Sequence, residues 1–135
     1  LTKRPGLMVA WAERHPWPEH VWAGVSVETA KYLPRLDVLT RVPAKIRFCS
    51  HEPLLGPQNV RPWLGRVLNW GIVGAESGPN GVRREMDLAW ARDIRDQYNA
   101  AGVPFWFKQV SGSRPELPGP ADLMLRELPD GKWNS

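Results

Sequence analysis

The chain has 135 residues, of which 42% are hydrophobic and 24% charged, values that suit one folded domain with a core of its own. The net charge of +4 permits a nucleic acid or another polyanion as partner, but no run of five or six Lys or Arg residues is present to form a basic arm. The single cysteine, Cys49, excludes an intrachain disulfide and a cysteine-ligated zinc or iron–sulfur site.

The sequence contains no apolar run of about 18 residues and no signal peptide, so we expect a soluble, cytoplasmic protein that does not interact with membranes. The first residue is Leu1 rather than Met, which indicates a processed chain or a fragment. Fourteen prolines predict many stiff loops, and eight tryptophans predict large apolar side chains in the core.

Taken in chain order, the sequence alternates helical and apolar segments. A helix is expected over 5–14, a strand over 21–27 and a helix over 29–42, with Pro34 in its first turns or at a kink. The remaining expected elements are a strand over 45–50, a short helix or turn within 59–68, a strand over 70–75, a helix over 87–101, a strand over 103–107 and a short strand over 123–128. The strands lack polar alternation, which is typical of parallel strands covered by helices and predicts an α/β fold.

We expect two parts in this organisation. Residues 1–110 form the α/β domain with its mainly parallel sheet. Residues 111–135 form a Pro-rich tail, with a short hairpin that turns at Pro129–Gly131, and this tail packs on the same domain.

A polar residue follows each predicted strand, namely Glu28, Glu52, Glu76 and Lys108. Because the carboxyl ends of parallel strands meet at one end of a sheet, we expect these side chains to form a shared rim and take them as the catalytic candidates. Carboxylates can serve as acid and base or hold a divalent metal, and Lys108 could bind an anion or neutralise the carboxylates. The pattern assigns no metal site, and the alternative is a strand end with solvated glutamates and turn glycines.

Other conspicuous residues receive a structural interpretation. His51 is more typical of a hydrogen-bonded loop residue than of a base, and Cys49 is interpreted as a buried, unreactive strand residue. Four tryptophans are interpreted as core side chains rather than as base-stacking platforms: Trp63, Trp70, Trp90 and Trp106.

An ordered set of short motifs points to a family. The motifs are Leu1–Pro5, Gly24–Glu28, Ser50–Pro57, Gly74–Pro79, Phe107–Gln109 and Asp130–Trp133. Together they resemble the C-terminal part of a phage and prophage protein family of unknown function, a radical-SAM-like group with a three-cysteine motif near its N-terminus. The resemblance implies a partial (half) β/α barrel with about four or five mainly parallel strands, carried on a mobile genetic element.

The resemblance also implies a ligand. The strand from Gly71 to Glu76 is similar to the glycine-rich strand that lies against the adenine of S-adenosylmethionine, so the cofactor-binding candidates are Gly71, Gly74, Glu76 and Ser77. It therefore implies a small, nucleotide-like ligand at the rim. This chain lacks the cysteine triad, so it holds no iron–sulfur cluster and is not a self-sufficient radical-SAM enzyme.

Two further departures from the family pattern concern His51 and Ala75, which stand where other residues are expected, and the loop after Gln109, which lacks Trp-Gly. The alternative function is a non-catalytic interaction protein of a mobile element that binds nucleic acid or a protein partner. Because a half-barrel leaves sheet edges and apolar side chains uncovered, we expect either the tail from Ser111 to Ser135 or a second copy to cover them. The second solution predicts a homodimer that buries at least ~1,000 Å² with Trp residues at its centre.

Overall fold

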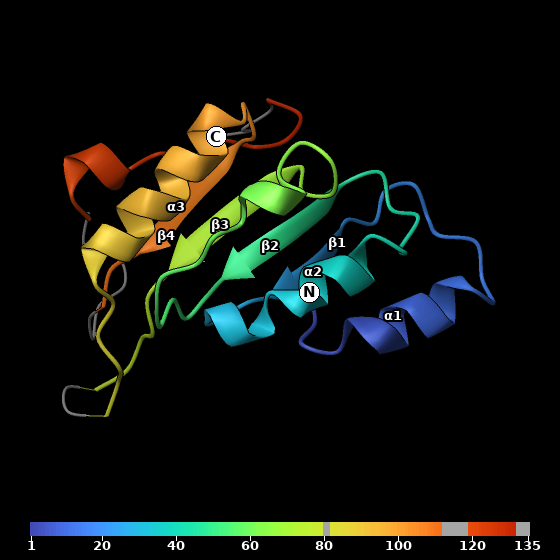
Figure 1. Cartoon of the computed structure of the whole chain (residues 1–135), viewed down its shortest axis with the longest axis horizontal. Helices are drawn as coiled ribbons and strands as arrows, with labels where there is room; N and C mark the ends of the chain where they lie inside the picture. Colours follow the sequence, from blue (N-terminus) through green and yellow to red (C-terminus); the bar gives the residue numbers. More distant parts are fainter. Residues whose placement is uncertain (80–81, 112–118, 132–135) are drawn as a thin grey trace.

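The computed structural model describes residues 1–79, 82–111 and 119–131. Its centre is one sheet of four strands in chain order: Ala23–Ser26 (β1), Arg47–His51 (β2), Trp70–Gly74 (β3) and Phe105–Gln109 (β4). All three neighbouring pairs are parallel (Figure 1). The prediction of an α/β fold with a parallel sheet is therefore confirmed, and each observed strand overlaps a predicted one.

The described residues form three α-helices: Pro5–Ala12 (α1) before β1, Pro34–Leu39 (α2) between β1 and β2, and Leu88–Ala100 (α3) between β3 and β4. Short 3₁₀-helices cover Ala30–Tyr32 (η1), Arg61–Trp63 (η2) and Ala121–Leu123 (η3). The helix predicted over 29–42 is split, because Pro34 lacks an N–H group and starts a new helix after η1. The side chain of Asp87 caps α3 by accepting a hydrogen bond of 2.8 Å from the backbone N of Ala89.

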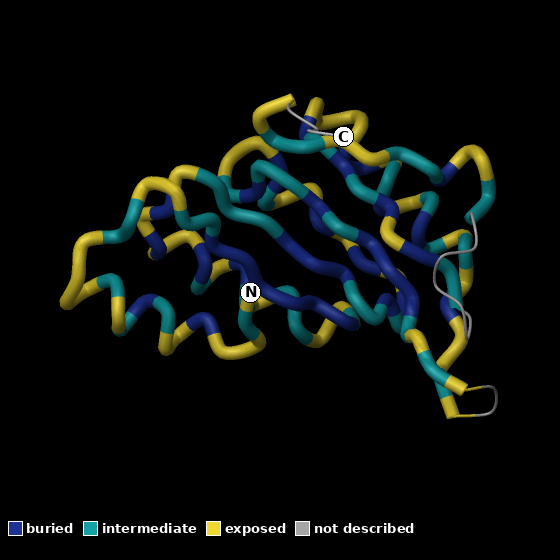
Figure 2. Tube along the Cα trace, turned by 180° about the vertical axis from the view of Figure 1, so that it is seen from behind, coloured by how far each residue is buried: buried dark blue, intermediate teal, exposed yellow. Residues whose placement is uncertain are grey.

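The helices cover only one face of the sheet. Figure 1 shows α2 and α3 in front of the strands and α1 beside α2, and Figure 2, seen from behind, shows the strands with no α-helix in front of them. Side chains alternate accordingly: Val25, Cys49 and Gly71 share a register position, Val25 and Cys49 are fully buried, and a Cβ added at Gly71 would point towards Tyr98 of α3. The residues beside them, such as Phe48 and Trp70, point to the uncovered face.

Segments of the same chain pair with both outer strands. Thr2 lies beside β1 as a parallel neighbour, with Thr2 N donating to Gly24 O at 3.0 Å and Ser26 N to Thr2 O at 3.1 Å. Residues 125–127 run antiparallel to β4, where Phe107 N donates to Leu125 O at 2.8 Å. Residues 125–127 of the expected tail therefore cover part of the β4 edge, and Thr2 covers part of the β1 edge.

The tail is described over residues 119–131. The strand expected over 123–128 is replaced by η3 and the short pairing with β4, since the chain turns at Leu123, which is fully buried. Gly131 has a φ of 66°, as the predicted turn requires, but the rest of the hairpin lies outside the described residues. Over the described ranges, no helix is long and apolar enough to cross a membrane.

Candidate functional site

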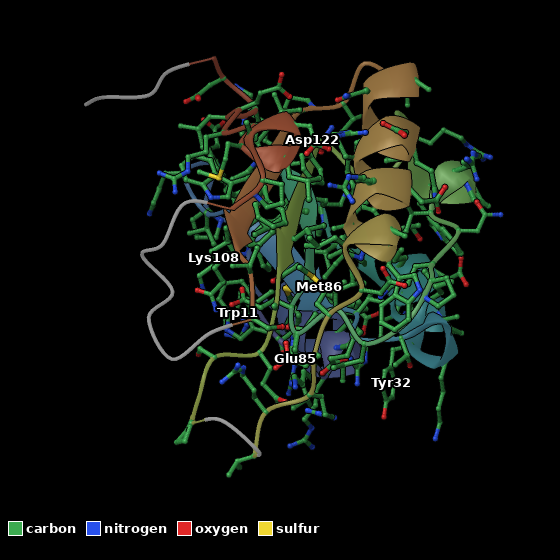
Figure 3. The ribbon with its side chains drawn as sticks, turned by 90° about the vertical axis from the view of Figure 1, so that its left-hand side faces the viewer. Trp11, Tyr32, Glu85, Met86, Lys108 and Asp122 are labelled. Carbon is green, nitrogen blue, oxygen red and sulfur yellow. The ribbon has the colours of Figure 1, made fainter. Side chains whose placement is uncertain are left out.

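The four candidate rim residues lie at the same end of the sheet. Glu28, Glu52 and Glu76 follow the carboxyl ends of β1, β2 and β3, and Lys108 is the penultimate residue of β4. Figure 3 shows Lys108 on the side of the sheet away from α3. The structure divides the four into two groups, because Glu28 and Glu76 line one cavity whereas Glu52 and Lys108 line another.

The rim cavity has a volume of about 360 Å³ and lies beyond the ends of β1 and β3. The residues that matter for its chemistry are Lys3, Glu28, Tyr32, Glu76 and Arg84. The cavity therefore carries two cations, two carboxylates and one phenol. No group of His, Cys, Asp and Glu suited to a metal ion occurs among the residues that the structure describes.

Glu28 is held by two cations although it is almost buried, with 7% of its surface exposed. Its Oε1 lies 2.5 Å from Lys3 Nζ, and its Oε2 accepts from Arg35 Nη1 at 2.9 Å. Burial raises the pKa of this carboxyl, but the hydrogen bonds and charges of Lys3 and Arg35 outweigh it, so that the pKa lies below its usual value. Glu28 is therefore an anion at neutral pH and not a proton donor.

Glu76 and Arg84 form a bidentate pair. Arg84 donates from Nη2 to Oε1 at 2.6 Å and from Nε to Oε2 at 3.0 Å, and its backbone N reaches Oε2 at 2.7 Å. These hydrogen bonds, the side-chain ones first, lower the pKa of Glu76 to about 2. The pair brings Arg84 and Glu76 together at the rim cavity and leaves the Arg84 side chain more than half exposed.

The open-face hollow is the second cavity, about 540 Å³ in volume, on the face of the sheet that no helix covers. It is lined by Phe48, Ser50, Glu52, Trp70, Ile72, Trp106 and Lys108, with Leu1 and Leu128 at its walls. Lys108 Nζ donates to Glu52 Oε1 at 2.7 Å. The lining is mostly apolar and aromatic, with polar groups confined to the strand C-terminal end.

The glycine-rich candidates are not gathered at the rim cavity. Gly71 faces the helices, where an added Cβ would come within 2.3 Å of the Tyr98 ring. At Gly74 an added Cβ would come within 3.1 Å of the carboxyl group of Glu52, and Ser77 is exposed. Packing against Tyr98 therefore accounts for the glycine at position 71 without a ligand.

Sequence reasoning missed the partners of Glu28 and Glu76, whereas Lys108, which was expected to neutralise a carboxylate or bind an anion, pairs with Glu52. Arg35 comes from α2 and Arg84 from a loop, and no spacing in the sequence connects either of them with a strand end. Trp63 and Trp90 pack against the core as predicted. Trp70 and Trp106 differ from the prediction, because they are half-buried on the uncovered face and line the open-face hollow.

His51 and Cys49 belong to the interior. Both are fully buried in β2, which confirms the burial expected for Cys49 and places His51 in a strand rather than a loop. His51 Nδ1 lies 2.7 Å from Gln58 Oε1 and Nε2 lies 3.1 Å from the hydroxyl of Tyr98. Burial lowers the pKa of His51 to about 4, so the imidazole is neutral and hydrogen-bonded on both sides.

Comparison with known proteins places the chain in a family. The model of a family described as protein of unknown function (DUF5131) matches residues 1–126. No curated protein and no solved structure matches the chain. Because the match extends over nearly all of its 135 residues, the chain belongs to the DUF5131 family.

Proposed function

We propose that this chain binds a small nucleotide-like ligand, of which S-adenosylmethionine is one example, in the rim cavity. The observation that carries the proposal is the meeting of Glu28 and Glu76 in a single cavity with Lys3 and Arg84. Glu28 and Glu76 come from two separate motifs of the resemblance, Gly24–Glu28 and Gly74–Pro79. A ligand that contacts both glutamates in this cavity would explain why the two motifs occur together in one chain.

The rim cavity suits a ligand that carries an anionic group and hydroxyl groups. Lys3 and Arg84 are more than half exposed and can bind a phosphate or a carboxylate. Glu28 and Glu76, both ionised, can accept hydrogen bonds from ribose hydroxyls or from an amine. The residues do not suit an iron–sulfur cluster, because the single cysteine is buried in β2, so no radical chemistry is assigned to this chain.

We also propose that the fold is a partial β/α barrel of a radical-SAM-like, phage-type protein. Parallel strands in chain order with helices on one face are the repeating unit of such barrels. The hollow on the other face gives further support, since Leu1 and Leu128 approach it from opposite edges of the sheet. In a β/α barrel the face of the sheet away from the helices is the interior of the barrel.

The alternative is a non-catalytic protein of a mobile element that binds nucleic acid or a protein partner. The net charge of +4 favours nucleic acid, but in the described part of the chain seven arginines form ion pairs with carboxylates: Arg35, Arg41, Arg61, Arg83, Arg84, Arg92 and Arg95. These pairs neutralise much of the basic surface locally. Binding to duplex DNA that weakens steeply with salt would support this alternative.

The proposal is tested by isothermal titration calorimetry with S-adenosylhomocysteine and adenosine. We expect saturable binding by the wild-type chain and a loss of at least tenfold in affinity for Glu76→Ala, since one good charge-assisted hydrogen bond is worth about 1.5–3 kcal/mol. Glu13→Ala is the matched control, because it removes a surface ion pair with Arg41 outside the cavity. Equal affinity of the Glu76→Ala variant and the wild type would refute the proposal.

A further inference from the structure

We infer that the open-face hollow is a second binding site, which takes a flat heteroaromatic molecule such as a nucleobase. The hollow shares no lining residue with the rim cavity, although the two come close where Glu52 lines one and Pro53 the other. Its volume of about 540 Å³ is in the range of sites for small molecules. This site does not depend on the ligand proposed for the rim cavity.

The aromatic side chains are fixed before any ligand arrives. Trp70 lies at their centre, with ring centroids 5.7 Å from Trp22, 5.5 Å from Phe48 and 6.3 Å from Trp106. Its Nε1–H donates to the backbone O of Glu127 at 2.8 Å, which holds the indole in place. Rigid aromatic rings that are half-exposed can stack on a flat ring system with little loss of conformational entropy.

The polar groups of the hollow select against a plain hydrocarbon. Ser50 is 3% exposed and lines the hollow, yet its hydroxyl makes no hydrogen bond within the described part of the chain. Among the described residues, Lys108 donates to Oε1 of Glu52 and neither group has a further hydrogen bond, so Oε2 and two protons of the ammonium group can bind a ligand. Donors and acceptors side by side at one end match the edge of a heteroaromatic ring with N–H groups and ring nitrogens.

The shape of the hollow favours a small molecule over a second copy of the chain. Leu1 and Leu128 form its walls from opposite edges of the sheet, so the surface is concave. Two concave surfaces cannot fill each other across a two-fold axis, and such a dimer would also bury the Glu52–Lys108 ion pair without new partners.

The test is a titration followed by the indole N–H signals of ¹⁵N-labelled protein, with adenine as probe and cyclohexanol as a non-aromatic control. We expect saturable shifts of the Trp70 and Trp106 signals with adenine and an unchanged Trp63 signal. Ser50→Ala should weaken adenine binding at least fivefold, and Trp106→Leu at least tenfold. Ser26→Ala is the matched control, because Ser26 is paired with Ser50 in the sheet and almost buried but does not line the hollow. Near-ultraviolet circular dichroism checks that each variant is folded.

Several results would overturn the inference. If the shifts do not saturate up to about 5 mM adenine, the site is excluded, because a titration to this concentration detects even weak, millimolar binding. Equal shifts with cyclohexanol would show unspecific apolar binding. A dimer in light scattering that Trp106→Glu turns into a monomer would show that a second copy occupies the face. Glu76→Ala should leave the affinity for adenine unchanged. A loss of affinity in this variant would show that adenine binds in the rim cavity instead.

Discussion

The ring of Tyr98 occupies the space that a side chain at Gly71 would need. A Cβ atom added to Gly71 would lie 2.3 Å from Cζ and 2.4 Å from Cε1 of this ring. The ring is anchored on its other side, since the Tyr98 hydroxyl lies 3.1 Å from Nε2 of His51. This contact joins α3 to the two central strands, and it gives the glycine in β3 a packing role.

Gly71→Ala should therefore destabilise the fold by about 1–3 kcal/mol, because overpacking a closed core forces side chains out of their rotamers. Urea denaturation followed by tryptophan fluorescence measures the effect. Gly6→Ala in α1 is the control, since nothing lies within 4 Å of its added Cβ, and it should be neutral or stabilising by up to about 1 kcal/mol. Equal stability of the two variants would contradict the packing role.

The buried imidazole of His51 should make the fold sensitive to mild acid. Burial lowers its folded pKa to about 4 from a usual value near 6.5, so between these values only the unfolded chain binds the proton. The stability that His51 confers is complete above pH 6.5, falls as the pH drops towards 4, and amounts to on the order of 3 kcal/mol.

Urea denaturation at a series of pH values from 7 to about 4.5 tests this window. Three carboxyls have a lowered pKa: Glu28, Glu76 and Asp122. The stability that they contribute is lost only as the pH falls below their unfolded pKa near 4, so their effect lies mainly outside the window from pH 7 to about 4.5. His51→Gln should be less stable at pH 7 but lose less stability on acidification. An identical pH dependence of variant and wild type would show that another group is responsible.

Glu28 should be important for stability as well as for the rim cavity. Glu28→Ala leaves Arg35, whose side chain is 18% exposed, without its carboxylate, and should cost about 3 kcal/mol, as expected when one partner of a buried pair is removed. Glu13→Ala breaks the exposed pair with Arg41 and should change stability by less than about 0.5 kcal/mol. A similarly small change in the free energy of unfolding for both variants would show that water solvates Arg35 as well as Glu28 does.

Cys49 should be inert in the folded protein. It is fully buried, and burial, with the charge of Glu28 as a smaller cause, raises the pKa of its thiol well above the usual value. A disulfide reagent such as Ellman's reagent should therefore react at once in urea but only at the rate of unfolding in native buffer. Rapid reaction under native conditions would show that β2 opens locally.

The sequence predicts the strands and the longest helix well, because their signals are local. An apolar run such as 70–75 identifies β3, and the helical spacing of Ala91, Ile94 and Tyr98, which are buried in α3, identifies that helix. The short pairing of residues 125–127 with β4 was only partly predictable, since it depends on Leu123 reaching the core from a distant part of the chain.

The strand-end position of the site residues could also be predicted, since it follows from parallel strands alone. The division of these residues between two cavities could not be predicted, because it depends on the face of the sheet towards which each side chain points. Lys108 lies inside β4 and faces away from the helices, whereas Glu28 turns towards Arg35 on α2. The network of His51, Gln58 and Tyr98 combines three segments far apart in the sequence, and no local pattern predicts it.

The position of Leu1 at the wall of the open-face hollow has a practical consequence for work on this protein. Thr2 is fixed beside β1, so any residues that precede Leu1 start at the edge of the hollow. A purification tag fused there would compete with ligands for the same space and would have to be cleaved before a titration. A small environment-sensitive dye on the amino terminus would instead report directly on whether the hollow is filled.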